Sequence, residues 1–104
     1  EEAMHEFRRR LYWLKICNCQ ELSCKFMEEH FSYIHWHVIS RTQKLTEGFM
    51  RTFYDRLNWT YITRYQKMSQ SFIREFQDYI NWEVLFTERN YSKKFLEEFS
   101  DRIL

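Results

Sequence analysis

The sequence predicts an all-α fold in which short helical hairpins repeat along the chain and stack as a small α-solenoid. The 104 residues include no proline and one glycine, so the residues that make tight β-turns are nearly missing. Apolar residues recur with the spacing of one helix face. A further observation is that tryptophan returns at a constant interval of 23 residues, at Trp13, Trp36, Trp59 and Trp82.

The tryptophan interval divides the chain, which we take as a single repeat domain. Its predicted parts are a half unit at 1–12 and complete units at 13–35, 36–58, 59–81 and 82–104. The half unit matches the second half of the third unit, because Met4, Phe7 and Leu11 align with Ile73, Phe76 and Ile80. We therefore expect residues 1–12 to pack as the second helix of a repeat.

The sequence pattern of each complete unit predicts a short helix, then a tight link, and then a longer helix. In the third unit, the first helix runs for about two turns from Trp59 to about Gln66, and Asn58 is a candidate N-cap, as Asn81 is one unit later. The link lies near 66–68. The second helix begins after Ser69, a hydroxyl N-cap with the counterparts Ser23, Thr46 and Ser92.

The second helix is amphipathic. Phe72, Ile73, Phe76 and Ile80 fall on one helical face, which predicts about 11 helical residues, a length of about 16 Å. Neither helix is stable alone, so neighbouring units must share one apolar seam. The competing interpretation is a closed helical bundle; a fixed period favours units that each meet the next in the same way.

Glutamine recurs in the link, at Gln20, Gln43 and Gln66, with Arg89 in the last unit. A feature present in nearly every unit usually serves what every unit needs. We therefore expect these side chains to bind backbone groups of a neighbouring unit rather than a ligand.

The composition excludes several classes of function. The sequence has 16 Lys and Arg residues and 15 Asp and Glu residues, so its net charge gives no indication of a polyanionic partner. The sequence has no glycine-rich loop, nucleophile elbow or metalloprotease motif, so we expect a non-catalytic protein without cofactors. It has no apolar run of about 20 residues and no signal peptide, so the expected location is intracellular, in a host cytoplasm. Met4 is an alternative to Glu1 as the expected start of the natural chain.

Cysteine and histidine gather in the first unit and at the start of the second. Thiolate and imidazole groups are the ligands that structural zinc prefers. The group consists of Cys17, Cys19, Cys24, His30, His35 and His37. The cysteine spacing lacks the CxxC pair of zinc knuckles, so we predict no metal site. His30 stands where other units have phenylalanine, which favours a buried, hydrogen-bonded histidine. The positions of Cys17, Cys19 and Cys24 in other units, such as Ser40, Thr42 and Glu47, look like ordinary variable positions.

Basic residues repeat in the second and third units, in the pairs Arg41 and Arg64, Lys44 and Lys67, and Arg51 and Arg74. Stacked units would align them in a central basic stripe. Tyrosines lie among these cations, and Tyr and Arg dominate protein-binding hot spots. The predicted partner-binding surface consists of Arg41, Lys44, Tyr54, Arg64, Tyr65 and Lys67. The same stripe could instead bind single-stranded nucleic acid, or simply be a solvated helix face.

The units resemble a short repeat of proteins from large DNA viruses and bacteriophages. The resemblance covers residues 1–104 and is closest in the third unit, in Gln66-Lys67-Met68-Ser69 and Phe72-Ile73-Arg74-Glu75-Phe76. The chain departs from the repeat at His30, Arg89 and Tyr91. The resemblance implies a viral repeat scaffold without a known reaction. We therefore expect a viral protein that binds a host protein, such as a defence component that it inhibits. Self-association through open repeat ends is a further possibility.

Overall fold

The computed structural model describes residues 2–102, and the side chains of residues 4–102. Every regular element in this range is a helix, which confirms the predicted all-α fold. The elements are α1 (Glu2–Cys19), α2 (Cys24–Glu29), α3 (Trp36–Thr42), α4 (Glu47–Thr52), α5 (Trp59–Tyr65), α6 (Gln70–Glu75), α7 (Trp82–Glu88), α8 (Lys93–Glu97) and a final 3₁₀ turn, η1 (Ser100–Arg102).

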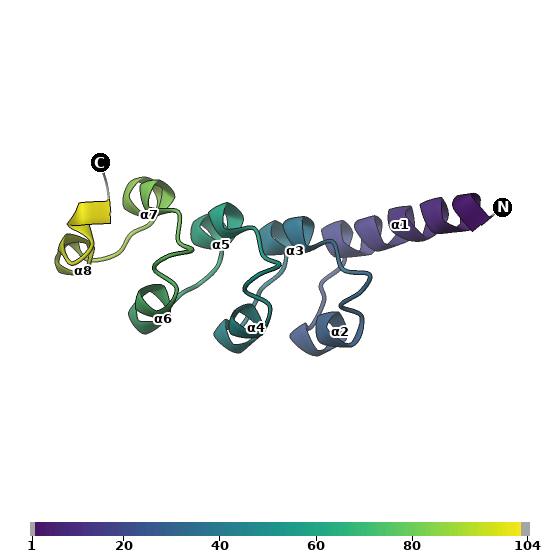
Figure 1. Cartoon of the computed structure of the whole chain (residues 1–104), viewed down its shortest axis with the longest axis horizontal. Coiled ribbons are helices and arrows are strands. Elements are labelled where there is room, and N and C mark those ends of the chain that lie inside the picture. The colour runs from purple at the N-terminus through teal and green to yellow at the C-terminus, as the bar shows by residue number, and fades with distance from the viewer. Residues whose placement is uncertain (1, 103–104) are drawn as a thin grey trace.

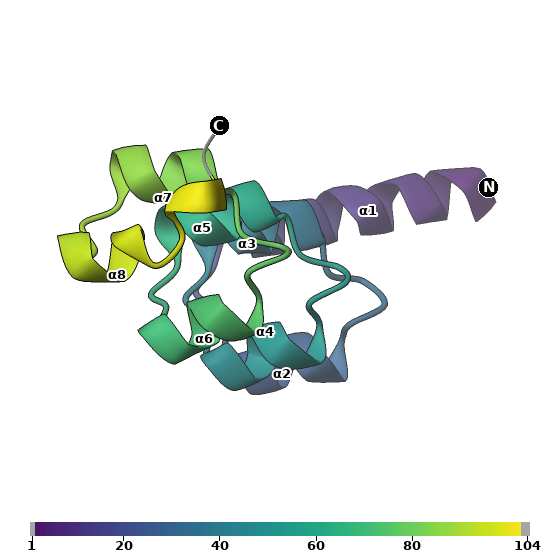
Figure 2. The ribbon, with the colours of Figure 1, turned by 60° about the vertical axis from the view of Figure 1, so that its left-hand side comes forward.

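The helices form two rows along an elongated molecule (Figure 1). Helices α1, α3, α5 and α7 pack side by side in chain order. Helices α2, α4 and α6 lie in a second row below them, as the turned view also shows (Figure 2). The radius of gyration is 16.0 Å, against about 13 Å for a compact domain of this length. This shape fits an open solenoid and not a closed bundle.

The predicted caps are present. Asn58 and Asn81 accept hydrogen bonds from Tyr61 N and Val84 N in the first turns of α5 and α7. The hydroxyl at each second helix does the same, so Ser69 accepts from Phe72 N at 3.1 Å, and Ser23, Thr46 and Ser92 cap α2, α4 and α8. These side chains satisfy first-turn N–H groups that a short helix leaves unpaired.

The second helices are shorter than predicted. Helices α4 and α6 have 6 residues each, not about 11. After the helical residues, Phe76 adopts a non-helical conformation, and Tyr79 N and Ile80 N then donate to Phe76 O. The chain thus turns early, which lets Ile80 enter the core and brings the next tryptophan back to the first row within a few residues.

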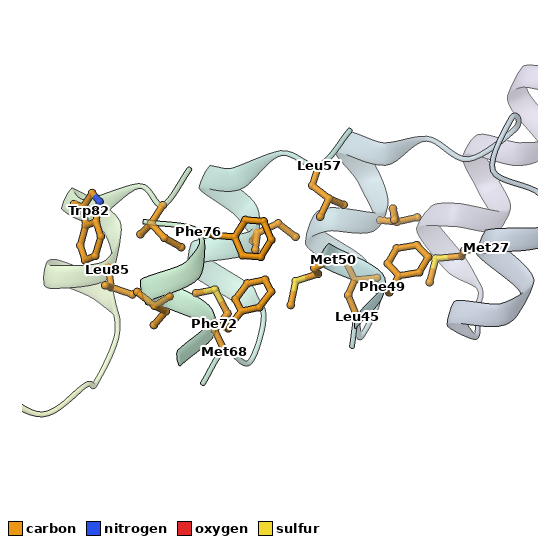
Figure 3. Packing of buried hydrophobic residues seen from close by; sticks show 14 of the residues in the cluster. Met27, Leu45, Phe49, Met50, Leu57, Met68, Phe72, Phe76, Trp82 and Leu85 are labelled. Carbon is orange, nitrogen blue, oxygen red and sulfur yellow. The ribbon is translucent and has the colours of Figure 1, made fainter. Parts of the chain in front are cut away.

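A continuous apolar seam lies between the rows (Figure 3). Each unit adds its own layer; in the third unit the layer contains Ile62, Phe72 and Ile73, all fully buried. The tryptophans have similar surroundings. Trp59 lies against Phe72 and Phe76 of its own unit, with ring centroids 6.2 and 5.4 Å away, and Trp36 and Trp82 contact the matching phenylalanines. Trp13 likewise lies 5.9 Å from Phe26 and 5.4 Å from His30, and it stacks on Tyr33 at 5.3 Å, as Trp59 lies against Tyr79.

The interpretation of residues 1–12 as a packed half unit is wrong for the part of it that is described. These residues continue directly into the first unit as one 18-residue helix, α1. Met4, Phe7 and Leu11 are 53%, 58% and 50% exposed. Their spacing is helical as expected, but no neighbouring helix covers this face among the described residues.

Link glutamines join successive units, as the sequence predicts for Gln43 and Gln66. Gln66 Nε2 donates to Ser40 O and Gln43 O at 3.1 and 2.6 Å, and its Oε1 accepts from Leu45 N at 3.0 Å. Gln43 makes the same three bonds to the first unit. Gln20 is exposed, and in the last unit Arg89 replaces the amide, donating to Thr63 O at 2.8 Å.

Within a unit, buried hydroxyls that the sequence analysis treats as variable hold the residue that caps the next helix. Ser40 accepts from Asn58 N at 3.0 Å, and Thr63 accepts from Asn81 N at 3.2 Å. Both are fully buried, and so is Cys17 at the matching position. Burial raises the pKa of the Cys17 thiol, which lies beside the His35 backbone. The view of the Ser40 position as ordinary is therefore wrong.

Candidate interaction surface

Three arginines pair with glutamates of the following unit, always 24 residues later. Arg51 donates from Nε and Nη2 to Glu75, Arg64 to Glu88 and Arg74 to Glu98, with distances of 2.8 to 3.0 Å. The hydrogen bonds from the guanidinium groups hold the pKa values of these three glutamates below the ordinary value of 4.5. Each pair is two-pronged, the geometry in which arginine and carboxylate groups fit best.

The predicted central stripe of six cations is therefore reduced to three. Arg51, Arg64 and Arg74 are neutralised by their glutamates. Within residues 2–102, Arg41, Lys44 and Lys67 form no ion pair. These three side chains remain exposed, and they carry the positive charge that a partner would meet.

The three unpaired cations surround one surface depression of about 570 Å³. It lies where α3 and α5 end and the two links begin. Its lining residues are Arg41, Thr42, Gln43, Lys44, Leu45, Tyr65, Gln66 and Lys67. Gln43, Leu45 and Gln66 form its buried base, and the cations and the exposed Tyr65 stand at its edge. We call Arg41, Lys44, Tyr65 and Lys67 the basic depression.

The same hollow occurs one unit earlier, with different charges. There it measures about 360 Å³ and is lined by Asn18, Cys19, Gln20, Glu21, Thr42, Gln43 and Lys44. Asn18 replaces Arg41 and Glu21 replaces Lys44, so the earlier hollow carries a carboxylate as well as a lysine. The positive character is a property of the junction between the second and third units.

One departure from the repeat keeps Arg41 unpaired. Arg64, the matching residue one unit later, binds Glu88. The residue that stands in the place of Glu88 for Arg41 is Tyr65, which has no carboxylate. Arg41 instead lies 6.0 Å from the ring centre of Tyr61. The depression can therefore offer a guanidinium group and the exposed ring of Tyr65 to a ligand.

The structure divides the six predicted partner-binding residues. Arg41, Lys44, Tyr65 and Lys67 come together in the basic depression. Arg64 is half-buried and occupied by Glu88. Tyr54 lies elsewhere, because its carbonyl accepts from Trp59 Nε1 at the start of α5, whereas Tyr65 ends that helix. Tyr54 is 39% exposed, and its ring packs against Tyr79 of the next unit, with ring centroids 5.3 Å apart.

The cysteines and histidines of the first unit do not converge. Among the described residues, no group of three or more His, Cys, Asp or Glu side chains is arranged to hold a metal ion. Cys17 is buried and Cys19 is exposed, and all three thiols are free. The predicted hydrogen bond of His30 is present, because its Nδ1 donates to Phe26 O at 2.9 Å, but the residue is half-buried and not buried as predicted.

Sequence reasoning missed Thr42 and Leu45 as lining residues, and it missed the ion pairs that remove Arg64 from the surface. Comparing each residue with the one 24 positions later would have found the pairs.

No helix described here is both long and apolar enough to cross a bilayer. The chain matches no known family, no curated protein and no solved structure.

Proposed function

We propose that the chain is a non-catalytic helical-repeat module that binds an acidic segment of a partner protein in the basic depression. The observation that carries this proposal is the set of three unpaired cations beside Tyr65, where Arg41 has a tyrosine and not a glutamate 24 positions later. Arginine and tyrosine supply much of the binding energy in protein interfaces. The lysines add attraction for carboxylates and speed association.

The resemblance to repeats of large DNA viruses and bacteriophages supports a host protein as the partner. In this proposal the module occupies a surface of a host protein, such as a component of antiviral or antiphage defence, and thereby inhibits it. Elongated solenoids suit this role because they present extended surfaces without needing a catalytic pocket.

A charge-reversal pair tests the proposal against a matched control. The variant Lys44→Glu with Lys67→Glu changes the depression, whereas Lys93→Glu with Lys94→Glu makes the same change in net charge on exposed residues of α8. Affinity capture from host lysate, with nuclease present, compares both variants with the parent chain. We expect the first variant to lose the captured protein and the second to retain it. Equal capture by both variants contradicts the proposal.

Single-stranded nucleic acid is the second candidate, because exposed Tyr65 and half-buried Tyr61 lie beside the cations and bases stack on aromatic rings. A labelled oligonucleotide of mixed sequence distinguishes the two. For phosphate-led binding to single strands, the logarithm of the association constant falls with that of salt, with a slope of about −0.7 per neutralised phosphate. If the oligonucleotide binds with such a slope and no protein is captured, this function replaces the first.

A further inference from the structure

The exposed part of α1 carries an apolar stripe that the solenoid does not use. Met4, Phe7, Leu11 and Leu14 are 53%, 58%, 50% and 39% exposed. Their spacings of three, four and three residues are those of the a and d positions of a heptad. A helix with this pattern buries the stripe against a second helix, by inserting each side chain between four residues of the partner.

The stripe faces away from the rest of the molecule. Trp13, which stacks on Tyr33, follows Leu11 by two residues and so lies about 200° around the helix axis. Arg9 lies 5.7 Å from the ring centre of Tyr33, on the same inner side. Both ribbon views show the N-terminal part of α1 extending beyond the other helices (Figures 1 and 2). Among residues 2–102, no helix stands between the stripe and a partner helix.

The flanks of the stripe are basic on both sides. Arg8 and Lys15 occupy e positions and Arg10 a g position, when Met4 and Leu11 are a. Arg10 is 3.9 Å from Glu6, at the limit of an ion pair. Arg8 and Lys15 form no ion pair within the described part of the chain. No acidic residue stands at an e or g position between residues 4 and 15.

These charges select the partner. In a dimer of this chain, a parallel arrangement places Arg10 against Lys15, and an antiparallel one places Arg8 and Lys15 against each other or themselves. Every charged contact is then repulsive, so a second copy is a poor occupant. A helix with apolar a and d positions and glutamates at e and g gains an attractive contact at each place.

We propose that the apolar stripe of α1 is a docking site for an acidic amphipathic helix of another protein. The helix lays its apolar face on Met4, Phe7, Leu11 and Leu14, and its glutamates pair with Arg8, Arg10 and Lys15. This binding mode is helix-against-helix recognition and is separate from the basic depression. It does not depend on the function proposed above.

The test uses two labelled synthetic peptides of about 21 residues, each with leucine at a and d. One carries glutamate at e and g and the other carries lysine. Fluorescence anisotropy with the full chain gives both affinities. We expect the glutamate peptide to bind at least about tenfold more tightly, because three attractive contacts replace three repulsive ones. The preference decreases in high salt.

Two variants locate the binding. Phe7→Ala with Leu11→Ala keeps strong helix formers on an exposed face. This variant should bind the glutamate peptide at least about tenfold more weakly than the parent chain does. Arg8→Glu with Lys15→Glu should transfer the preference to the lysine peptide. The Lys44→Glu and Lys67→Glu variant should bind the glutamate peptide like the parent chain. Circular dichroism checks that each variant keeps its helices.

Three outcomes would overturn the proposal. The first is equal affinity for the two peptides, and the second is binding that ignores the alanine variant. The third is a dimer, seen by analytical ultracentrifugation, that the alanine variant dissociates, since a second copy would then be the occupant.

Discussion

Replacing Gln66 tests whether buried amides hold the repeat units together. Gln66→Leu keeps a side chain of similar size but removes three hydrogen bonds, to Ser40 O, Gln43 O and Leu45 N. Gln66 is 4% exposed and Leu45 is 7% exposed, so water cannot readily replace the lost partners. Each buried group left unpaired costs about 1–3 kcal/mol, and the added apolar burial offsets about 1 kcal/mol. We expect a net loss of about 3 kcal/mol in the free energy of unfolding.

Gln20 supplies the matched control, because it holds the same repeat position. Its side chain is exposed and donates no hydrogen bond within the described residues. Gln20→Leu should therefore change the free energy of unfolding by less than about 0.5 kcal/mol. Gln43→Leu, in contrast, should resemble Gln66→Leu, because Gln43 binds Cys17 O, Gln20 O and Leu22 N.

Urea unfolding followed by circular dichroism measures these changes, and amide hydrogen exchange locates them. A repeat array can lose coupling between units before it unfolds as a whole. We therefore expect the Leu45 amide, which donates to Gln66, to exchange faster in Gln66→Leu than in the parent chain. The reasoning is refuted if Gln20→Leu and Gln66→Leu lose the same stability, or if exchange at Leu45 does not change.

Three further predictions concern other contacts. Thr63→Val leaves Asn81 N without its acceptor and should cost about 1–2 kcal/mol in urea unfolding, whereas Thr87→Val, whose exposed hydroxyl only donates to Glu83 O, should be nearly neutral. The lowered pKa values of Glu75, Glu88 and Glu98 contribute stability above pH 4.5, and this stability is lost as the pH falls through the folded-state pKa values. Replacing all three glutamates by Gln should make the free energy of unfolding decline less steeply with falling pH. An unchanged decline contradicts this prediction. Iodoacetamide should label exposed Cys19 in the native protein but label Cys17 only after unfolding, because Cys17 is fully buried and its pKa is raised; peptide mapping by mass spectrometry reads both sites.

The sequence predicts the architecture well because the repeat averages out local ambiguity. A single serine is weak evidence for a cap, but Ser69 recurs as Ser23, Thr46 and Ser92, and all four cap a helix. Helix length is predicted less well. The apolar spacing from Phe72 to Ile80 is compatible with a continuous helix, yet the chain turns at Phe76. Periodicity records which residues are buried and not how the backbone brings them there.

Alignment on the repeat also misplaces residues 4–11. Met4, Phe7 and Leu11 align with buried residues of the third unit, but they are exposed because residues 2–12 run on into the first helix of the next unit. Asn58 and Asn81 are non-helical residues directly before Trp59 and Trp82, and each caps the helix that follows. Tyr12, which precedes Trp13, offers no such cap, so the helix continues through it.

The candidate site is found by comparing residues 24 positions apart, whereas the repeat aligns residues 23 positions apart. Aligning residues 23 apart pairs Arg41 with Arg64 and suggests equal roles. Side chains of adjacent units meet 24 residues apart, as the pair of Arg64 with Glu88 shows. Under that comparison, Arg41 corresponds to Tyr65. Arg64 is then a neutralised structural residue, and Arg41 is an unpaired cation. A functional surface on this solenoid is therefore expected where the residue 24 positions later fails to complement its partner. The basic depression is such a place.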